Sequence, residues 1–173
     1  MSQFLRGEWN LKLTIDSASY AALRHHAEEA YPNECCGVLT GHFEGDGNKA
    51  TVAISCANTR QDSPRNRYRI APIDLVRIQR QAREEGRDII GFYHSHPDHP
   101  AQWSTTDLTE AHWLDCSYVI TGVIAGQAAE TRSFRLVGIA EQGTAEQGTA
   151  EQDPMGAGPT NEKQFVEESL EIR

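Results

Sequence analysis

Two histidines and a carboxylate near the middle of the sequence have the residue types and spacing of a metal site. His94 and His96 stand two residues apart, directly before Pro97, and Asp107 follows in Ser104-Thr105-Thr106-Asp107. Two histidines and one carboxylate form a catalytic zinc ligand set that leaves a fourth position for water. The sequence therefore predicts one zinc ion per chain, held by His94, His96 and Asp107, and a hydrolytic reaction.

The predicted secondary structure explains how these side chains could meet. His94 and His96 lie at the end of a predicted strand, where residues two apart share a face at roughly 6.5–7 Å along the backbone. Ser104 is a natural helix N-cap, and Ser104 and Asp107, three residues apart, share a helical face. The pair of histidines alone is a weak signal, but the spacing H-x-H-x7-S-x2-D is rare enough to disfavour chance strand-end histidines beside an ordinary cap.

Glu34 is the candidate proton carrier. It lies between a predicted helix that stops at Pro32 and a predicted strand that begins near Cys36, so it could overlook the strand ends. A carboxylate beside an activated water can take its proton and pass it to a leaving amine. Taken alone, Glu34 is better explained as a solvated loop residue, so its role depends on the wider pattern.

That wider pattern resembles the JAMM metallopeptidases, the catalytic branch of the MPN domains, and in particular their small bacterial members. The resemblance covers about residues 11–139 and rests on three segments: Pro-Asn-Glu-Cys-Cys-Gly around Glu34, Gly-Phe-Tyr-His-Ser-His-Pro-Asp-His-Pro-Ala from Gly91, and the Ser-x-x-Asp that ends at Asp107. Trp103 stands where bacterial members usually carry proline, which affects the expected loop shape and substrate fit.

The resemblance implies a fold and a set of roles. The fold would be α/β (α+β), a single MPN/JAMM-like domain with a mixed central sheet flanked by helices, in a cytidine-deaminase-like layout. Glu34 would be the general base and then the general acid, and Ser104 would polarise the oxyanion or the water. The substrate would be an amide or isopeptide bond after the Gly-Gly tail of a ubiquitin-like sulfur-carrier protein, or another peptide.

Three other classes of protein are alternatives to a JAMM metallopeptidase. A non-catalytic MPN scaffold is the main one, but such members lose metal ligands, whereas all five polar positions are present here. A zinc nucleoside deaminase needs P-C-x-x-C together with its H-x-E, and P-C-x-x-C does not occur. A DNA-repair relative with the same motif is disfavoured by the acidic charge of the chain.

Four further residues are weak candidates for substrate binding. Arg65, Arg67 and Arg69 alternate in the polar loop 58–71, where they could hold an acidic partner, although a charge run usually faces water. His99 follows the histidine pair in the same loop as Pro97, and an ordinary solvated loop histidine is its simpler interpretation.

Length, charge and cysteine spacing exclude several classes of protein. A chain of 173 residues suits one compact domain, and its net charge of -9 argues against a nucleic-acid partner. No apolar run approaches the roughly 18 residues of a membrane helix, and the start lacks the apolar core of a secretion signal. The four cysteines form no C-x-x-C pair and are expected to be reduced. We therefore expect a cytoplasmic protein without membrane contact.

Hydrophobic periodicity and turn residues divide the chain into elements and domains. Residues 1–139 form the expected catalytic domain, with helices at about 17–30, 72–86 and 104–113, and strands at 11–15, 36–43, 51–57, 88–95, 118–125 and 131–139. The repeated Ala-Glu-Gln-Gly-Thr makes residues 140–160 an expected disordered acidic linker. Residues 161–173 are expected to return as an edge strand of the same domain with Val166, Leu170 and Ile172 inward, a frayed tail or short helix being the alternative.

Overall fold

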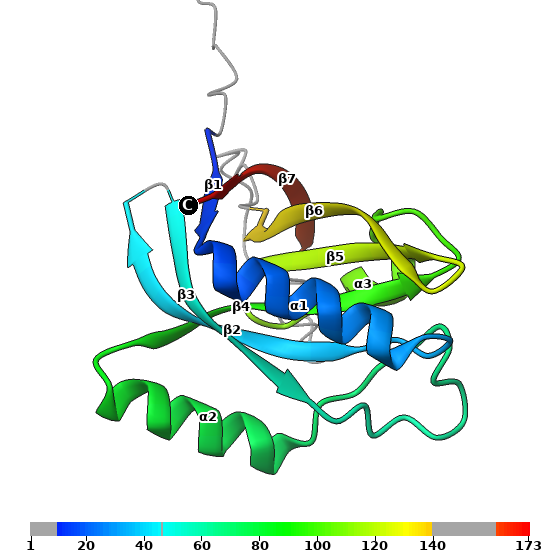
Figure 1. Ribbon diagram of the computed structural model, residues 1–173. Coiled ribbons are helices and arrows are strands. Elements are labelled where there is room, and N and C mark those ends of the chain that lie inside the picture. Colours follow the sequence, from blue (N-terminus) through cyan, green and yellow to red (C-terminus); the bar gives the residue numbers. More distant parts are fainter. Residues whose placement is uncertain (1–9, 46, 140–161) are drawn as a thin grey trace, which may run out of the picture.

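In the part of the chain that the structure describes, seven strands form one mixed sheet that closes on itself (Figure 1). The computed structural model describes residues 10–45, 47–139 and 162–173. Around the barrel the strand order is β1-β3-β2-β4-β5-β6-β7, with β1 parallel to both its neighbours and β4 parallel to β5. The strands are β1 (Lys12–Ile15), β2 (Cys36–Glu44), β3 (Gly47–Cys56), β4 (Asp88–Pro97), β5 (Ser117–Ile124), β6 (Gln127–Gly138) and β7 (Lys163–Ile172). The expected mixed sheet is thus confirmed, and its closure into a barrel is an added feature.

Three helices accompany the sheet within the described ranges, and their first residues show why they begin where they do. In α1 (Ser17–Ala30) the Asp16 side chain accepts a hydrogen bond from the Ser19 N–H at 2.6 Å, an N-cap that satisfies an otherwise unpaired donor. Proline opens α2 (Pro72–Glu84), where its missing N–H has no cost. The shorter α3 (Thr105–Glu110) ends before the expected Trp113.

The hydrophobic core has one cluster on each face of the sheet. On the first face, α1 lies across the strands (Figure 1) and buries Leu23 and Ala27, which share a helical face because they are four residues apart. On the second face, Ile78 of α2 packs with Phe92 of β4 and Tyr118 of β5. The sheet is therefore apolar on both sides, and the residues of β4 alternate between the two clusters.

The orientation of α2 differs from the sequence expectation. In the sequence, Ile73, Val76, Ile78 and Ala82 roughly follow helical spacing, which predicts one shared apolar face. In the structure, Ile73 and Val76 are instead 72% and 62% exposed. Leu75 instead packs against the core beside Ile78. Several sets of apolar residues in this helix fit a helical repeat, and contact with β4 selects one of them.

The C-terminal strand also differs from the expectation. β7 pairs antiparallel with β6 and parallel with β1, so it closes the barrel and is not an edge strand. Its buried side chains are Phe165 and Glu168, whereas Ile172 is 48% exposed, and Val166 and Leu170 are only partly buried. The strand changes partner after Glu168, so one alternation pattern does not hold along its length.

Glu168 is buried because it has charged and polar partners. Its carboxylate accepts hydrogen bonds from Arg135 at 2.5 Å and from the Ser133 hydroxyl at 2.7 Å. A buried charge is tolerated only when it is paired in this way. The sequence pattern of β7 gives no sign of this pairing, because both partners lie on β6.

The acidic repeat lies in residues 140–161, outside the described residues, so its expected disorder remains a prediction. The ends of this segment are adjacent, since the Ile139 N–H donates to the Glu162 carbonyl at 2.7 Å. We expect that replacing residues 140–161 with a short glycine-rich turn would leave β6 and β7 paired, and the metal content and catalytic rate unchanged. Metal analysis and turnover of the shortened protein test this, and a loss of either beyond about twofold would contradict it.

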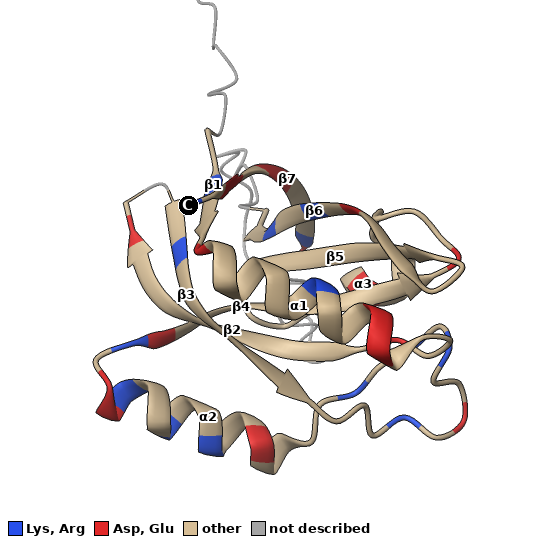
Figure 2. Cartoon of the chain, in the orientation of Figure 1, with Lys and Arg blue, Asp and Glu red and all other residues tan. Residues whose placement is uncertain are grey.

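Charged side chains are unevenly placed over the fold (Figure 2). Lysine and arginine positions mark α2 and the loop that follows β3, although the chain as a whole is acidic. Within the described ranges, no helix is both long and apolar enough to cross a membrane.

Candidate metal and catalytic site

His94 and His96 lie on the same face of β4, near its C-terminal end. Both are buried, and their Nε2 atoms approach each other to 3.0 Å. The adjacent residues Tyr93 and Ser95 face the opposite side, as strand geometry requires. Two ring nitrogens therefore meet at one point, as the spacing of the two histidines predicts.

Asp107 brings a carboxylate to the same point from the first turn of α3. Its two oxygens lie 3.2 Å from His94 Nε2 and 3.5 Å from His96 Nε2. The helix start fixes its position, because Ser104 and Asp107 form a capping box in which each side chain accepts from the backbone N–H of the other. The Ser104 hydroxyl also donates to the Asp107 carboxylate at 2.7 Å. Ser104 thus positions Asp107 and lies next to the candidate metal ligands.

Neighbouring groups orient the two imidazoles. His96 Nδ1 lies 3.2 Å from the Pro100 carbonyl. Because a carbonyl oxygen can only accept a hydrogen bond, Nδ1 carries the proton of the neutral ring, and the lone pair of Nε2 points at the cluster. The Tyr68 ring stacks on His94 with a centroid separation of 4.7 Å. Burial lowers the pKa of His94, although the hydrogen bond and negative charge of Asp107 oppose this shift. A neutral His94 is the form that can bind a metal ion.

Asp107 is ionised in this setting. Burial alone would raise its pKa, but a proton shared with His94 or His96 in the metal-free site, together with the hydrogen bond from Ser104, brings the pKa below its usual range. One nitrogen from each histidine and one Asp107 oxygen all lie within 4.8 Å of one another. Two neutral imidazoles and a carboxylate suit zinc, and the facing lone pairs would repel without a proton or cation between them. These residues therefore fit a bound metal ion.

Glu34 is buried beside the cluster rather than solvated. It is 4% exposed, and its backbone is fixed at both ends: its N–H donates to the Pro64 carbonyl at 2.8 Å, and its carbonyl accepts from Asn58 at 3.2 Å. Burial raises the pKa of Glu34 to about 9, and the negative charges of Asp107 and Glu110 add to the effect. A cation at the cluster would oppose this shift, so Glu34 is suited to exchange a proton.

A serine between the two histidines ties Glu34 to β4. The Ser95 hydroxyl accepts from the Cys35 N–H at 2.8 Å, and the Ser95 N–H donates to the Cys35 carbonyl at 3.3 Å. Cys36, the next residue, is paired with His94 across the sheet. The candidate proton carrier Glu34 and the two histidines are therefore held in one register by β2 and β4.

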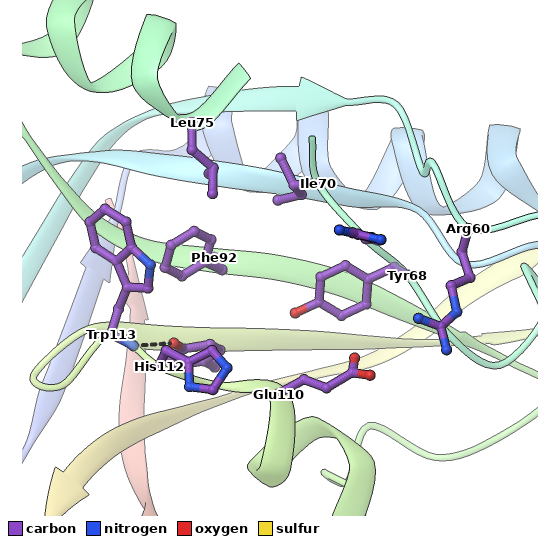
Figure 3. Close-up of a pocket in the computed structure, with 10 residues that line it drawn as sticks. Arg60, Tyr68, Ile70, Leu75, Phe92, Glu110, His112 and Trp113 are labelled. Carbon is purple, nitrogen blue, oxygen red and sulfur yellow. Dashed lines mark hydrogen bonds between the residues drawn. The ribbon is translucent and has the colours of Figure 1, made fainter. Parts of the chain in front are cut away.

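Two pockets lie on either side of the ligands along β4. The first, which we call the aromatic pocket, has about 410 Å³ and begins at Phe92, with Tyr68, Trp113, Glu110 and Arg60 around it (Figure 3). The second, the polar pocket, has about 530 Å³ and lies beyond the histidines. It is lined by Asp62, Ser63, Pro64, Arg65, Asn66, Pro97, Asp98 and His99.

The four weak candidates for substrate binding occupy different places. Arg65 and His99 both line the polar pocket, whereas Arg69 lines the aromatic pocket. Arg67 lines neither pocket and is exposed. The three arginines thus do not form one surface, because the loop runs past the metal ligands from one side to the other.

Several residues that shape the site were missed by sequence reasoning. Tyr68, Ser95 and Pro100 contact the histidines or their neighbours. Ser95 and Pro100 lie within the segment from Gly91 that carries the resemblance but were given no role, and Tyr68 lies outside the three segments. Glu110 could have been identified, because it follows Asp107 by three residues and so shares its helical face. The others are placed by tertiary contacts that local patterns do not encode.

A closed mixed sheet with a His-His-Asp cluster at a strand end and a buried glutamate beside it defines a single α/β domain with a JAMM-type site. Comparisons with known proteins agree: residues 16–137 match the family described as prokaryotic homologs of the JAB domain. The match covers most of the chain, and the protein belongs to this JAMM family.

Curated relatives and solved structures are similar over most of their own length. A desampylase of Haloferax volcanii is 33% identical over 113 residues, which are 63% of this chain and 79% of that protein. A CysO-cysteine peptidase of Mycobacterium tuberculosis is 29% identical over 72% of this chain and 83% of its own. A solution structure from Salinibacter ruber has a TM-score of 0.61 at 29% identity and covers 92% of this chain and 91% of that one. Another, from Desulfitobacterium hafniense, has a TM-score of 0.68 at 23% identity, covers 93% of this chain and 92% of that one, and supports the fold alone.

Proposed function

We propose that this protein is a zinc-dependent hydrolase that cleaves an amide bond. The observation that carries the proposal is the convergence of His94, His96 and Asp107 beside a buried Glu34. When bound, zinc would activate a water molecule and polarise the carbonyl group of the substrate. His94, His96 and Asp107 would hold this ion, one per chain.

In the proposed reaction Glu34 moves the proton. As the carboxylate it accepts a proton from the attacking water, and as the acid it donates that proton to the leaving amine. Its burial excludes bulk water, which would otherwise supply competing protons. The Ser104 hydroxyl, beside Asp107, can turn to donate a hydrogen bond to the oxyanion that develops on the carbonyl.

The proposed substrate is a ubiquitin-like sulfur-carrier protein extended beyond a Gly-Gly tail. Support comes from relatives named desampylase, CysO-cysteine peptidase and, in Thermus thermophilus, probable TtuB-protein conjugate cleaving protease. The last is 30% identical over 67% of this chain and 74% of its own length. Four free thiols, three of them buried, are compatible with action in the reducing cytoplasm.

A substrate tail could pair with a free strand edge beside the site. β4 offers no such edge, because it is paired with β2 on one side and with β5 on the other. The segment around Tyr68 is the better candidate. Backbone groups of Arg67 and Arg69 form hydrogen bonds with Asn58 and Thr59. Among the described residues, the Tyr68 N–H and C=O form no hydrogen bond with Asn58 or Thr59. An extended tail could pair with Tyr68 there, and glycine would permit a close approach to His94.

The alternative is a non-catalytic MPN scaffold. Members of that kind would be expected to lack a complete ligand set or the proton carrier. Here His94, His96 and Asp107 converge, and Glu34 is buried next to them. Burying a carboxylate costs folding free energy, and a residue with only a structural role would not need to be one. The geometry therefore favours the enzyme.

Metal analysis and a cleavage screen test the proposal together. We expect purified protein to contain about one zinc per chain and to hydrolyse carrier proteins from its own genome just after Gly-Gly when they bear C-terminal extensions. Mass spectrometry of the products locates the cleaved bond, and a carrier with Gly-Gly changed to Ala-Ala is the matched control. Zinc-loaded protein that leaves extended carriers intact while cleaving unrelated peptides would contradict the proposed substrate.

A further inference from the structure

An extended substrate that crosses the metal ligands would reach both pockets. Along β4 the order is Phe92 in the aromatic pocket, then His94 and His96, then Pro97 and Asp98 in the polar pocket. At about 3.3 Å per residue, Phe92 and Asp98 are roughly 20 Å apart. One pocket would therefore receive the acyl side of the cleaved bond and the other the amine side.

The polar pocket is attached directly to the proton carrier and to a metal ligand. Pro64, next to Arg65 in its wall, accepts the hydrogen bond from the Glu34 N–H at 2.8 Å. His99, which also lines this pocket, donates its backbone N–H to the His96 carbonyl at 3.4 Å. Since Glu34 would protonate the leaving amine, the polar pocket is the natural place for the amine side of the substrate.

The acidic residues of this pocket already have partners. Asp98 accepts hydrogen bonds from the Tyr31 hydroxyl and from the Ala125 N–H, each at 3.0 Å. Asp62 pairs with Arg60 at 2.9 Å. These contacts fix the loops. Arg60 balances the charge of Asp62, whereas Asp98 stays ionised, because its two hydrogen bonds and the nearby charge of Arg65 lower its pKa.

Compared with these acidic residues, the basic residues of the polar pocket are available to bind a ligand. Arg65 is exposed, and its guanidinium forms no ion pair or hydrogen bond with any part of the chain that the structure describes. His99 is likewise exposed across the pocket. An arginine binds a carboxylate through two parallel hydrogen bonds, and an imidazole N–H can add a third. Arg65 and His99 thus supply hydrogen-bond donors that an anionic group could use.

We propose that Arg65 and His99 bind the free α-carboxylate of a single amino acid joined to the Gly-Gly tail, and so select linear extensions over isopeptide-linked lysine. This inference rests on the proposed function. The carboxylate of such an amino acid is two bonds from the nitrogen that leaves, close to Glu34. An isopeptide bond to lysine has only a methylene chain at that position, which gives Arg65 no partner.

Three synthetic probes with the same carrier-tail sequence test the preference. One ends in Gly-Gly-Ala with a free carboxylate, the second ends in Gly-Gly-alaninamide, and the third joins Gly-Gly to the side chain of an N-acetyl-lysine amide. We expect kcat/KM to be about 10- to 100-fold higher for the free acid than for the amide. Arg65→Gln should reduce this ratio to near one, whereas Arg67→Gln, two residues away and outside the pocket, should keep it.

A binding measurement separates this inference from the proposed function. Titrating zinc-loaded protein with alanine or alaninamide, and following the His99 imidazole by NMR, should give a carboxylate-dependent shift that Arg65→Gln removes and Arg67→Gln retains. Two results would overturn the carboxylate site and leave the hydrolase intact. One is cleavage without a preference for the free acid, and the other is an equal loss of kcat/KM for the free-acid and amide probes in Arg65→Gln. Arg65-dependent alanine binding without cleavage of any probe would overturn the proposed substrate and keep the site.

Discussion

Glu34→Gln should lower kcat by roughly two to four orders of magnitude while leaving the zinc content unchanged. Glutamine has nearly the same shape as glutamate and can keep the backbone bonds to Pro64 and Asn58, which do not involve the side chain. It cannot accept and return a proton. Single-turnover kinetics on an extended carrier and metal analysis of the same sample measure both quantities, and turnover near that of the wild type would exclude Glu34 as the proton carrier.

The same variant should be more stable than the wild type when metal is removed. The pKa of Glu34 rises from its model-peptide value of 4.5 to about 9 in the fold, mainly through burial. The stability that protonated Glu34 contributes is complete below the unfolded pKa and is lost as the pH rises towards 9. The gain from Glu34→Gln should therefore appear above about pH 5 and grow to on the order of 1–3 kcal/mol near pH 8.

Chemical unfolding of both proteins in the presence of a chelator, at pH 5 and at pH 8, measures this gain. A residue that is catalytic and unfavourably buried gives opposite signs for activity and stability on substitution. If metal-free Glu34→Gln were less stable than the wild type at pH 8, Glu34 would have a structural role instead.

The elements that position the metal ligands were predictable because their determinants are local. The apolar run that begins at Ile89 identifies β4, the two-residue repeat of a strand places His94 and His96 on one face, and the Ser104–Asp107 spacing identifies a capped helix start. Each of these features is decided within about ten residues. Their convergence was inferred from the resemblance to a family, since no local pattern brings α3 to the end of β4.

Non-local pairing and irregular loops account for what sequence reasoning missed. β7 completes the barrel across a gap of more than twenty residues, and the burial of Glu168 depends on Arg135 in another strand. Residues 58–71 have no hydrophobic period, so nothing in their sequence separates Arg65 and Arg69 into different pockets. The Asn58 side chain fixes the later part of this loop through hydrogen bonds with backbone groups of Arg67 and Arg69, which is a tertiary contact that the loop sequence does not predict.

The second large effect is expected at Asp107, which has two roles that must be separated. It supplies an oxygen to the metal cluster, and it completes the capping box of α3 with Ser104. Loss of the cap alone costs about 1 kcal/mol of stability. Loss of the ligand leaves two histidines, too few to retain zinc against a moderate chelator.

Asp107→Ala should therefore lose most of its zinc and nearly all of its activity, with only a modest change in folding. Ser104→Ala is the matched control, because it weakens the same cap but leaves His94, His96 and Asp107 in place; it should retain close to one zinc per chain while turning over more slowly. Zinc content after dialysis against chelator, with circular dichroism on the same samples, measures both effects. Equal zinc in Asp107→Ala and the wild type would refute the ligand assignment. Equal zinc loss in both variants would show that the helix start, and not the carboxylate, holds the site together.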